Sequence, residues 1–254
     1  MAQPILRLEG LTKYFGGVTA AEDVNFAIYP GQIRGLIGPN GAGKTTIMNL
    51  ICGIYEADKG EIYFDEEPIS KLPDYKRARL GIGRTFQQPR FLQRSNIREN
   101  LLIGSDLDDQ MGYMKSFFSP KTGGFEAELA ELMKVAGFEV DIDDEISGLP
   151  YGQLKLLEIV RSMLSHPKVM LVDEPAAGLN GAEQNRAMDL LNLAASQNIG
   201  VVLIEHSMDM VMNLCHEITV LNFGCVIAEG SPAEISKNKT VIEAYLGRRR
   251  HAAN

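Results

Sequence analysis

The sequence predicts an α/β fold with a mostly parallel sheet, an antiparallel β layer and an inserted helical subdomain. Short apolar segments precede helical stretches along much of the chain, which is typical of a parallel sheet covered on both faces. Near the N-terminus the apolar residues follow a two-residue period instead, which indicates an antiparallel layer. Between Gln88 and Pro167 the pattern becomes helical, without a convincing strand. We therefore expect a single domain, residues 1–254, with a helical insertion.

The individual elements follow from these patterns. Parallel strands are expected at Ile33–Ile37, Ile82–Thr85, Val169–Val172, Val201–Ile204 and Glu217–Asn222. The antiparallel layer is expected at Ile5–Glu9, Asp23–Ile28 and Glu61–Phe64. Inserted helices are expected at Ile97–Gly104, Phe125–Ala136 and Gln153–Leu164, with Ser105–Gly124 as a long surface connection. Residues 1–87 and 166–254 would then form the core, and residues 88–165 the helical subdomain.

Composition narrows the class of protein. With 254 residues, 45% of them apolar, the chain can bury a sizeable core. No stretch approaches the roughly 20 apolar residues that cross a bilayer, and Met1–Pro4 does not open a leader-like pattern, so a cytoplasmic protein is expected. The three cysteines lack metal-like spacing, which favours free thiols in a reducing compartment. The net charge of −8 argues against nucleic acid as a partner.

The run Gly38-Pro39-Asn40-Gly41-Ala42-Gly43-Lys44-Thr45-Thr46 has the spacing of a phosphate-binding loop. An expected strand precedes it and an expected helix follows it, which is the context that the motif requires. Its glycines let backbone N–H groups and the helix N-terminus point at phosphates. Lys44 would reach the β- and γ-phosphates, and the Thr45 hydroxyl would bind Mg²⁺. We therefore expect ATP and Mg²⁺ as ligands, held by Gly38, Asn40, Gly41, Gly43, Lys44, Thr45 and Thr46. The α/β core is then that of a P-loop ATPase.

Two adjacent carboxylates, Asp173 and Glu174, follow the expected strand Val169–Val172. Neighbouring side chains on a strand point to opposite sides, so the two carboxylates have different roles. Asp173 can face Mg²⁺ beside Thr45, and Glu174 can face an attacking water as its general base or orienting group. In a chain with a phosphate-binding loop, this pair predicts hydrolysis of the nucleotide.

The segment Leu149–Gln153 resembles the signature motif of ABC-type ATPases, Leu-Ser-Gly-Gly-Gln. In that family the motif faces the γ-phosphate of ATP held by another subunit, which implies that Gly152 and Gln153 bind the partner's nucleotide. Gly152 would permit close backbone approach, and a helix beginning near Gln153 would supply partial positive charge. Pro150 and Tyr151 depart from the motif. Because Pro150 has neither N–H nor hydroxyl, the usual Ser contact to the γ-phosphate is lost.

Other ABC motifs follow in the required order. Thr85–Pro89 resembles the Q-loop, which implies that Gln87 touches Mg²⁺ and the attacking water. Ala177–Asn180 stands at the place of the D-loop, with Asn instead of the commoner Asp at its last position, so a contact there across the dimer would be neutral. His206, at the end of an expected strand, matches the switch histidine that hydrogen-bonds the γ-phosphate.

The adenine base needs a flat apolar surface. Lys13–Gly17 resembles the aromatic loop with which ABC ATPases stack on adenine. Phe15 aligns with that loop better than Tyr14 does. Since neighbouring strand residues face opposite ways, one of the two would stack on the base and the other would pack inward or face solvent.

Several segments are most similar to one subgroup of the family, the ATP-binding subunits of prokaryotic branched-chain amino acid importers, usually called the LivG class. These segments are Arg84–Gln87, Tyr151–Gln153, Leu157–Ile159, Asp173–Asn180, Ile204–His206 and Ala244–Gly247. The resemblance implies a second ABC ATPase subunit, identical or different, because each composite site takes its loop and its signature from different subunits. It also implies integral-membrane permease subunits, indirectly a periplasmic solute-binding protein, and a place on the inner face of the cell membrane.

Two other functions stay open at this point. Importers for urea or short amides use very similar ATPases, so the solute is not determined by these motifs. A soluble ABC ATPase without a transport role, as in iron–sulfur cluster assembly, would carry the same nucleotide site in a single domain. A small-molecule kinase built on the phosphate-binding loop is disfavoured by the signature-like segment together with His206.

Overall fold

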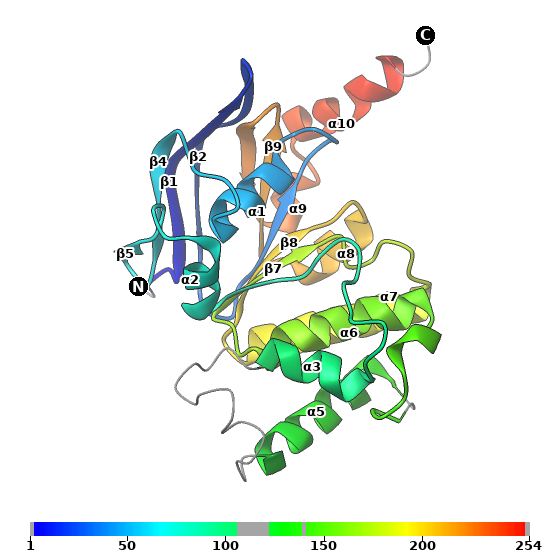
Figure 1. Ribbon diagram of the computed structural model, residues 1–254. Coiled ribbons are helices and arrows are strands. Elements are labelled where there is room, and N and C mark those ends of the chain that lie inside the picture. Colours follow the sequence, from blue (N-terminus) through cyan, green and yellow to red (C-terminus); the bar gives the residue numbers. More distant parts are fainter. Residues whose placement is uncertain (1–2, 106–121, 139–140, 252–254) are drawn as a thin grey trace.

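Two sheets and the surrounding helices form the structure, a computed structural model that describes residues 3–105, 122–138 and 141–251 (Figure 1). The larger sheet has six strands in the order β10-β9-β3-β8-β7-β6. They are β3 (Ile33–Ile37), β6 (Ile82–Arg84), β7 (Val169–Asp173), β8 (Gly200–Ile204), β9 (Glu217–Asn222) and β10 (Cys225–Gly230). In the part of the chain that is described, β10 is antiparallel to β9, and the other neighbours are parallel. The mostly parallel sheet is thus confirmed.

The second sheet is antiparallel and has four strands in the order β2-β1-β4-β5. They are β1 (Leu6–Phe15), β2 (Val18–Ile28), β4 (Lys59–Phe64) and β5 (Glu67–Pro68). All three segments predicted for this layer fall on it, but β1 and β2 are longer than predicted. The register of β1 against β2 shifts between Leu8 and Leu11 and again beyond it, so the two-residue period that marks a strand is broken there.

The helices cover both faces of the larger sheet. They are α1 (Lys44–Cys52), α2 (Asp74–Arg79), α3 (Ile97–Ser105), α5 (Thr122–Ala136), α6 (Tyr151–Leu164), α7 (Gly181–Ser196), α8 (Met208–Leu214), α9 (Pro232–Ile235) and α10 (Lys239–His251), with a 3₁₀ turn at Ile146–Gly148. The expected inserted helices correspond to α3, α5 and α6. Most of the expected connection Ser105–Gly124 lies outside the described residues.

The beginning of α6 corrects the sequence prediction. This helix starts at Tyr151 rather than near Gln153, and Pro150 occupies its N-cap position with φ −57° and ψ 150°. A proline tolerates this place because the first N–H groups of a helix lack intrahelical partners in any case. The signature-like residues therefore lie within the first turn of α6.

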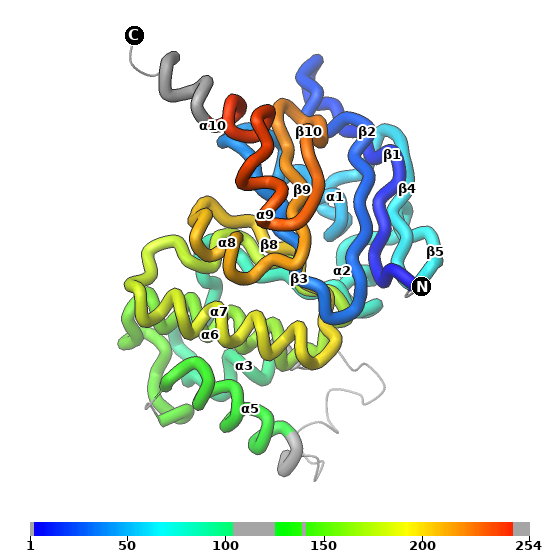
Figure 2. Tube along the Cα trace, turned by 180° about the vertical axis from the view of Figure 1, so that it is seen from behind, coloured from blue at the N-terminus to red at the C-terminus, as the bar shows by residue number. Residues whose placement is uncertain are grey.

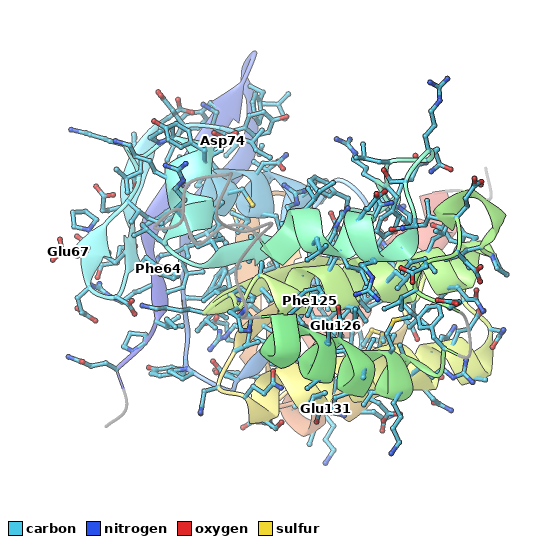
Figure 3. All side chains as sticks on the ribbon, turned by 60° about the horizontal axis from the view of Figure 1, so that its bottom comes forward. Phe64, Glu67, Asp74, Phe125, Glu126 and Glu131 are labelled. Atoms are coloured by element: carbon cyan, nitrogen blue, oxygen red, sulfur yellow. The ribbon has the colours of Figure 1, made fainter. Side chains whose placement is uncertain are left out.

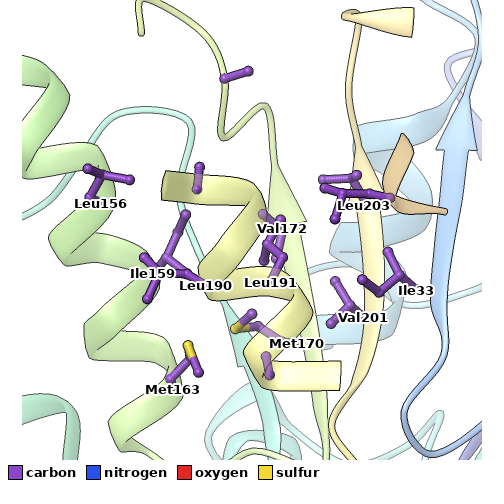
Figure 4. Packing of buried hydrophobic residues seen from close by; sticks show 14 of the residues in the cluster. Ile33, Leu156, Ile159, Met163, Met170, Val172, Leu190, Leu191, Val201 and Leu203 are labelled. Atoms are coloured by element: carbon purple, nitrogen blue, oxygen red, sulfur yellow. The ribbon is translucent and has the colours of Figure 1, made fainter. Parts of the chain in front are cut away.

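The strands are apolar on both faces because each face of the larger sheet packs against its own cluster. On β7, Met170 and Val172 point toward α6 and α7, whereas Val169 and Leu171 belong to the cluster shared with α1 and the antiparallel sheet. Figure 4 shows the first of these clusters, in which Leu156, Ile159 and Met163 of α6 pack beside Leu190 and Leu191 of α7. The helix α1 is thereby enclosed between the two sheets, which fixes the loop that precedes it.

The inserted helices share the first cluster with the sheet. Helix α6 contacts α3, α5 and α7, and residues of α3 and α5 such as Leu101 and Leu129 join the same apolar cluster. On α5, Phe125 packs against this cluster and Glu131 is exposed; Figure 3 labels both side chains. The side chain of Arg98 on α3 forms ion pairs with Glu126 of α5 and with Asp143. The boundary of the helical subdomain at residues 88–165 stays a prediction.

The C-terminal helix α10 contacts β10 at the edge of the larger sheet, as Figure 2 shows from behind. Val241 is buried, and Tyr245 packs against the same cluster as α6. Searched over the residues that the structure describes, the helices include none that combines the length and apolar character needed to span a membrane.

Arg77 is expected to contribute strongly to stability. It is 2% exposed and donates to the carbonyls of Leu50 and Ile51 at the end of α1, and to those of Ser70 and Leu72. Replacing it by Met leaves these buried acceptors without donors, so we expect the free energy of unfolding to fall by about 3 kcal/mol. Urea unfolding followed by circular dichroism measures this loss. The exposed neighbour substitution Lys76→Met is the control, and equal stability of the two variants would contradict the role of Arg77.

Candidate active site

The loop between β3 and α1 can be built only with glycine at two positions. Gly38 has φ +152° and Gly43 has φ +106°, conformations that side chains rarely adopt. A Cβ atom on Gly38 would lie 2.1 Å from the carbonyl oxygen of Leu221, and one on Gly43 would lie 2.3 Å from that of Ala20. The backbone is therefore held close to β9 and β2, and its curvature is fixed before any ligand binds.

The N-terminus of α1 is prepared for an anion. Its N-cap is Gly43, no side chain of the described residues caps it, and its first turn has no acidic residue. By contrast, α7 is capped by Asn180, whose side-chain oxygen accepts from the N–H of Glu183 at 3.0 Å. Since uncapped first-turn N–H groups and the helix dipole attract anions, the first turn of α1 fits a phosphate. Thr45 is exposed at this turn.

Lys44 lies inside the loop. It is 7% exposed, and its Nζ donates to the carbonyl oxygens of Gly38 at 2.8 Å and Pro39 at 3.1 Å. These bonds place a positive charge within the curve of backbone that the sequence assigns to phosphate. An ammonium with rotatable donors can exchange carbonyl oxygens for phosphate oxygens without moving the helix.

Asp173, at the end of β7, is 7% exposed, and its backbone N–H donates to the Thr85 hydroxyl at 3.2 Å. Burial raises the pKa of this carboxyl, and the guanidinium of Arg84, with its Nη2 3.7 Å from Oδ2, opposes that rise. Mg²⁺ usually takes one or two carboxylates together with substrate phosphates and water. A buried strand-end carboxylate and the exposed Thr45 hydroxyl fit this donor set. Arg84 was not among the predicted site residues, although it belongs to Arg84–Gln87, one of the segments that resemble the LivG class.

The three residues predicted to be catalytic meet at Glu174. The Nε2 of Gln87 donates to its Oε2 at 2.8 Å, and the Nε2 of His206 lies 3.0 Å from its Oε1. Glu174 also has φ +48°, a left-handed conformation that non-glycine residues rarely adopt and that clusters at functional sites. A carboxylate oriented by an amide and an imidazole is suited to position a water and accept its proton.

Glu205 is a site residue that the sequence prediction missed. It is 4% exposed and accepts from the backbone N–H groups of Ala176 at 2.6 Å, His206 at 2.8 Å and Ser207 at 3.1 Å. These bonds fix the backbone of His206 and of the segment after Glu174. The signal was present in Ile204-Glu205-His206, but a strand-end carboxylate beside a histidine does not reveal which backbone groups it binds.

The signature-like residues pack within their own chain. A Cβ on Gly152 would lie 2.2 Å from a carboxylate oxygen of Glu183, so a larger residue here would displace that side chain at the start of α7. The Oε1 of Gln153 is buried and has no hydrogen-bond partner among the described residues. Asn180 and Glu183 form a capping box at the start of α7, which gives Asn180 a role inside the chain as well.

The aromatic residues near Gly16 are equally accessible. Tyr14 and Phe15 are each 40% exposed. The ring of Phe15 meets that of Tyr55 edge to face at 5.1 Å, and the Nζ of Lys13 lies 5.4 Å from its centroid. Phe15 therefore belongs to a small aromatic surface, as a base-stacking residue requires. Neither side chain packs inward, so burial does not distinguish the residue that would stack on adenine from the one that would face solvent.

Helix α10 also reaches the phosphate-binding loop. Burial raises the pKa of the Tyr245 phenol, and the nearby backbone N–H of Gly38 opposes that rise. Tyr245 belongs to the segment Ala244–Gly247 that the sequence analysis singled out. It lies beside this loop, although it was not predicted to be a site residue.

Comparisons with known proteins agree with this geometry. The profile of the ABC transporter family matches residues 21–177, and a profile described as branched-chain amino acid ATP-binding cassette transporter matches residues 225–251. The chain is 40% identical to the high-affinity branched-chain amino acid transport ATP-binding protein BraF of Pseudomonas aeruginosa, over 97% of this chain and 99% of that protein. It is 38% identical to the corresponding protein LivG of Escherichia coli K12, with the same coverage.

Solved structures show the same fold. The ADP conformation of MJ1267, an ATP-binding cassette of an ABC transporter, is similar with a TM-score of 0.83 and 31% identity over 97% of this chain and 100% of that chain. A nucleotide-free ATP-binding cassette from an ABC transporter gives a TM-score of 0.79 with 30% identity, over 96% of this chain and 99% of that chain.

Proposed function

The chain belongs to the ABC transporter ATP-binding family, and on this basis we propose that it is the ATP-hydrolysing subunit of an importer for branched-chain or related amino acids. The ATPase activity rests on one observation above all, the meeting of Gln87 and His206 on the carboxylate of Glu174. The class of solute rests on the relatives, which are named as branched-chain amino acid transport proteins and match nearly the full length of this chain. These relatives do not favour a urea or amide importer, or a soluble ATPase of iron–sulfur cluster assembly.

ATP is proposed to bind across the phosphate-binding loop. Phe15 stacks on adenine, and the backbone of Gly38–Thr46 with Lys44 surrounds the phosphates. Thr45, Asp173 and Gln87 would hold Mg²⁺, which would neutralise negative charge on the phosphates. Glu174 accepts the proton of the attacking water, while His206 stabilises charge on the γ-phosphate.

A second ATPase subunit is proposed to complete each site, because Gly152 and Gln153 lie in the first turn of α6 and not in the loop that would hold this chain's own nucleotide. Pro150 removes one contact that this chain would offer to the nucleotide of its partner. If the partner is a different subunit with an unaltered signature, the composite site that contains Lys44 and Glu174 of this chain would be the stronger of the two. Two bound ATP molecules would close the dimer, and hydrolysis would reopen it.

The permease is proposed to dock beside the segment that follows Gln87. A groove of about 440 Å³ is lined there by the apolar residues Pro89, Phe91, Leu92 and Ile103 and by the polar residues Arg90, Gln93, Asn100 and Arg161. Leu92 and Ile103 are more than half exposed, at 56% and 58%. An apolar helix end of an integral-membrane permease fits such a groove, and the docked subunit would lie on the inner face of the membrane.

Coexpression with candidate permease subunits tests the transport function. The chain is expected to sediment with membranes only when its permease is present, and ATP hydrolysis by the purified complex should rise when a loaded solute-binding protein is added. Leucine, isoleucine and valine are compared with urea and acetamide as the loaded solutes. Copurification with a soluble scaffold protein, with no permease dependence, would refute the importer function. Stimulation by urea alone would show that the solute is urea rather than a branched-chain amino acid.

A further inference from the structure

The ammonium group of Lys155 lies between two catalytic segments. Lys155 is on α6, one turn after Tyr151, and is 3% exposed. Its Nζ donates to the backbone carbonyl of Gln87 at 2.9 Å and to that of Glu174 at 2.8 Å. The same two residues are joined through their side chains, Gln87 Nε2 to Glu174 Oε2. One side chain of the signature helix thus holds both residues by their backbone.

This position is unfavourable for a lysine on general grounds. Burial lowers its pKa, and the carboxylates of Glu205, Asp173 and Glu174 oppose that shift. Desolvation of an ammonium is expensive unless its donors are satisfied, and here the acceptors that satisfy it are two catalytic backbones.

Two further contacts hold the same turn of α6 against the segment after Glu174. The ring of Tyr151 leaves no room for a Cβ on Gly178, which would lie 2.9 Å from it, and Gly152 packs on Glu183. The first turn of α6, which begins at the signature, therefore packs against the D-loop segment and the start of α7. One turn further along α6, Lys155 adds the polar bonds to the catalytic carbonyls.

We infer that Lys155 is a positioning residue that couples the signature helix to the orientation of Gln87 and Glu174 in the same chain. When the partner's nucleotide draws the start of α6 toward itself, the ammonium transmits that displacement to the two carbonyls. The role rests on the proposed ATPase function, since it concerns the residues that carry hydrolysis. Gly152 and Gln153 would then do more than bind the partner's nucleotide; their position would also set the geometry of this chain's own site.

The substitution Lys155→Met tests the coupling in the full transport complex. Methionine has a similar length without donors, so we expect kcat for ATP hydrolysis to fall about 10- to 100-fold, the loss typical of a small misplacement of catalytic groups. The KM for ATP should stay within about threefold, because the nucleotide-binding loop is untouched. Lys155→Arg keeps a charged donor and should recover most of the turnover. Lys168→Met, at the opposite end of β7 and paired with Asp65, is the control and should leave kcat unchanged.

A merely structural lysine would behave differently. Its loss would lower the melting temperature while kcat of the folded fraction stayed near the wild-type value, and that outcome overturns the inference. Equal losses in Lys155→Met and Lys155→Arg would also overturn it. If Lys155→Met does not fold, Lys155→Gln, which keeps one amide donor, is measured by the same criteria. A wild-type complex without ATP hydrolysis would instead refute the proposed function, so the two failures are distinguishable.

A double-mutant cycle adds a readout specific to the mechanism. Because Lys155 is inferred to act through Gln87 and Glu174, Lys155→Met should lower kcat much less in a Gln87→Ala background than in the wild type. Multiplicative losses in the double variant would mean that Lys155 acts independently of the Gln87 side chain and would contradict the coupling through that residue.

Discussion

Replacing Glu174 by Gln should abolish turnover while ATP still binds. Glutamine can keep its oxygen toward Gln87 Nε2 and place its NH₂ toward His206, so the contacts at 2.8 Å and 3.0 Å need not be lost. The missing property is the negative charge that accepts a proton from water. General base catalysis contributes about 10²- to 10⁴-fold, and kcat is expected to fall by that factor.

Phosphate release and equilibrium binding of radiolabelled ATP measure the two properties separately. The dissociation constant for ATP should be unchanged or lower in the variant, because the phosphate-binding loop is untouched and one negative charge of the site is removed. Glu67→Gln, on the exposed strand β5, is the matched control and should hydrolyse ATP at the wild-type rate. Normal turnover in Glu174→Gln would assign the proton transfer to another group.

The parallel strands and the phosphate-binding loop were predictable because their signals are local. The strand Ile33–Ile37 was located with its observed bounds, and so was Glu217–Asn222, since an apolar run with turn residues on both sides leaves few alternatives. The glycine pattern at Gly38 and Gly43 encodes a backbone curve that only glycine allows. Such features depend on a few adjacent residues.

The edges of the sheets were harder to predict. The strand β10 was missed because its residues Cys225–Gly230 are only partly buried and do not alternate clearly. The strand β5 has two residues, too few for any period to be visible. The bulges in β1 similarly break the two-residue period, so the second half of that strand was not predicted. Pairing with a neighbouring strand, rather than the local sequence, determines these elements.

The catalytic residues of the site were predicted from motifs, but the residues that position them were not. Gln87, Glu174 and His206 were named from three separate segments, and the structure brings them together. Arg84 and Lys155 act through contacts with residues far away in the sequence, at Asp173 and at the carbonyls of Gln87 and Glu174. No spacing along the chain indicates such contacts, so only the fold reveals them.

Lys44→Ala should fail at an earlier step than Glu174→Gln. The ammonium is buried within the loop and bonded to the carbonyls of Gly38 and Pro39, so its removal takes away the charge that the phosphates meet. Truncating one partner of a buried charged pair typically weakens binding by 2–5 kcal/mol, so we expect the dissociation constant for ATP to rise at least about 30-fold.

Calorimetric titration with ATP and with ADP measures this effect. The ratio of the affinity lost for ATP to that lost for ADP shows which phosphates the Lys44 ammonium contacts. Lys44 is expected to contact the β- and γ-phosphates, so ATP, which has both, should lose more affinity than ADP. Lys168→Ala removes an exposed lysine that pairs with Asp65 at 2.6 Å, and it should bind both nucleotides normally. An ATP affinity within threefold of wild type in a folded Lys44→Ala protein would contradict this role. Turnover lost with binding intact, as expected for Glu174→Gln, would instead place Lys44 in the chemical step.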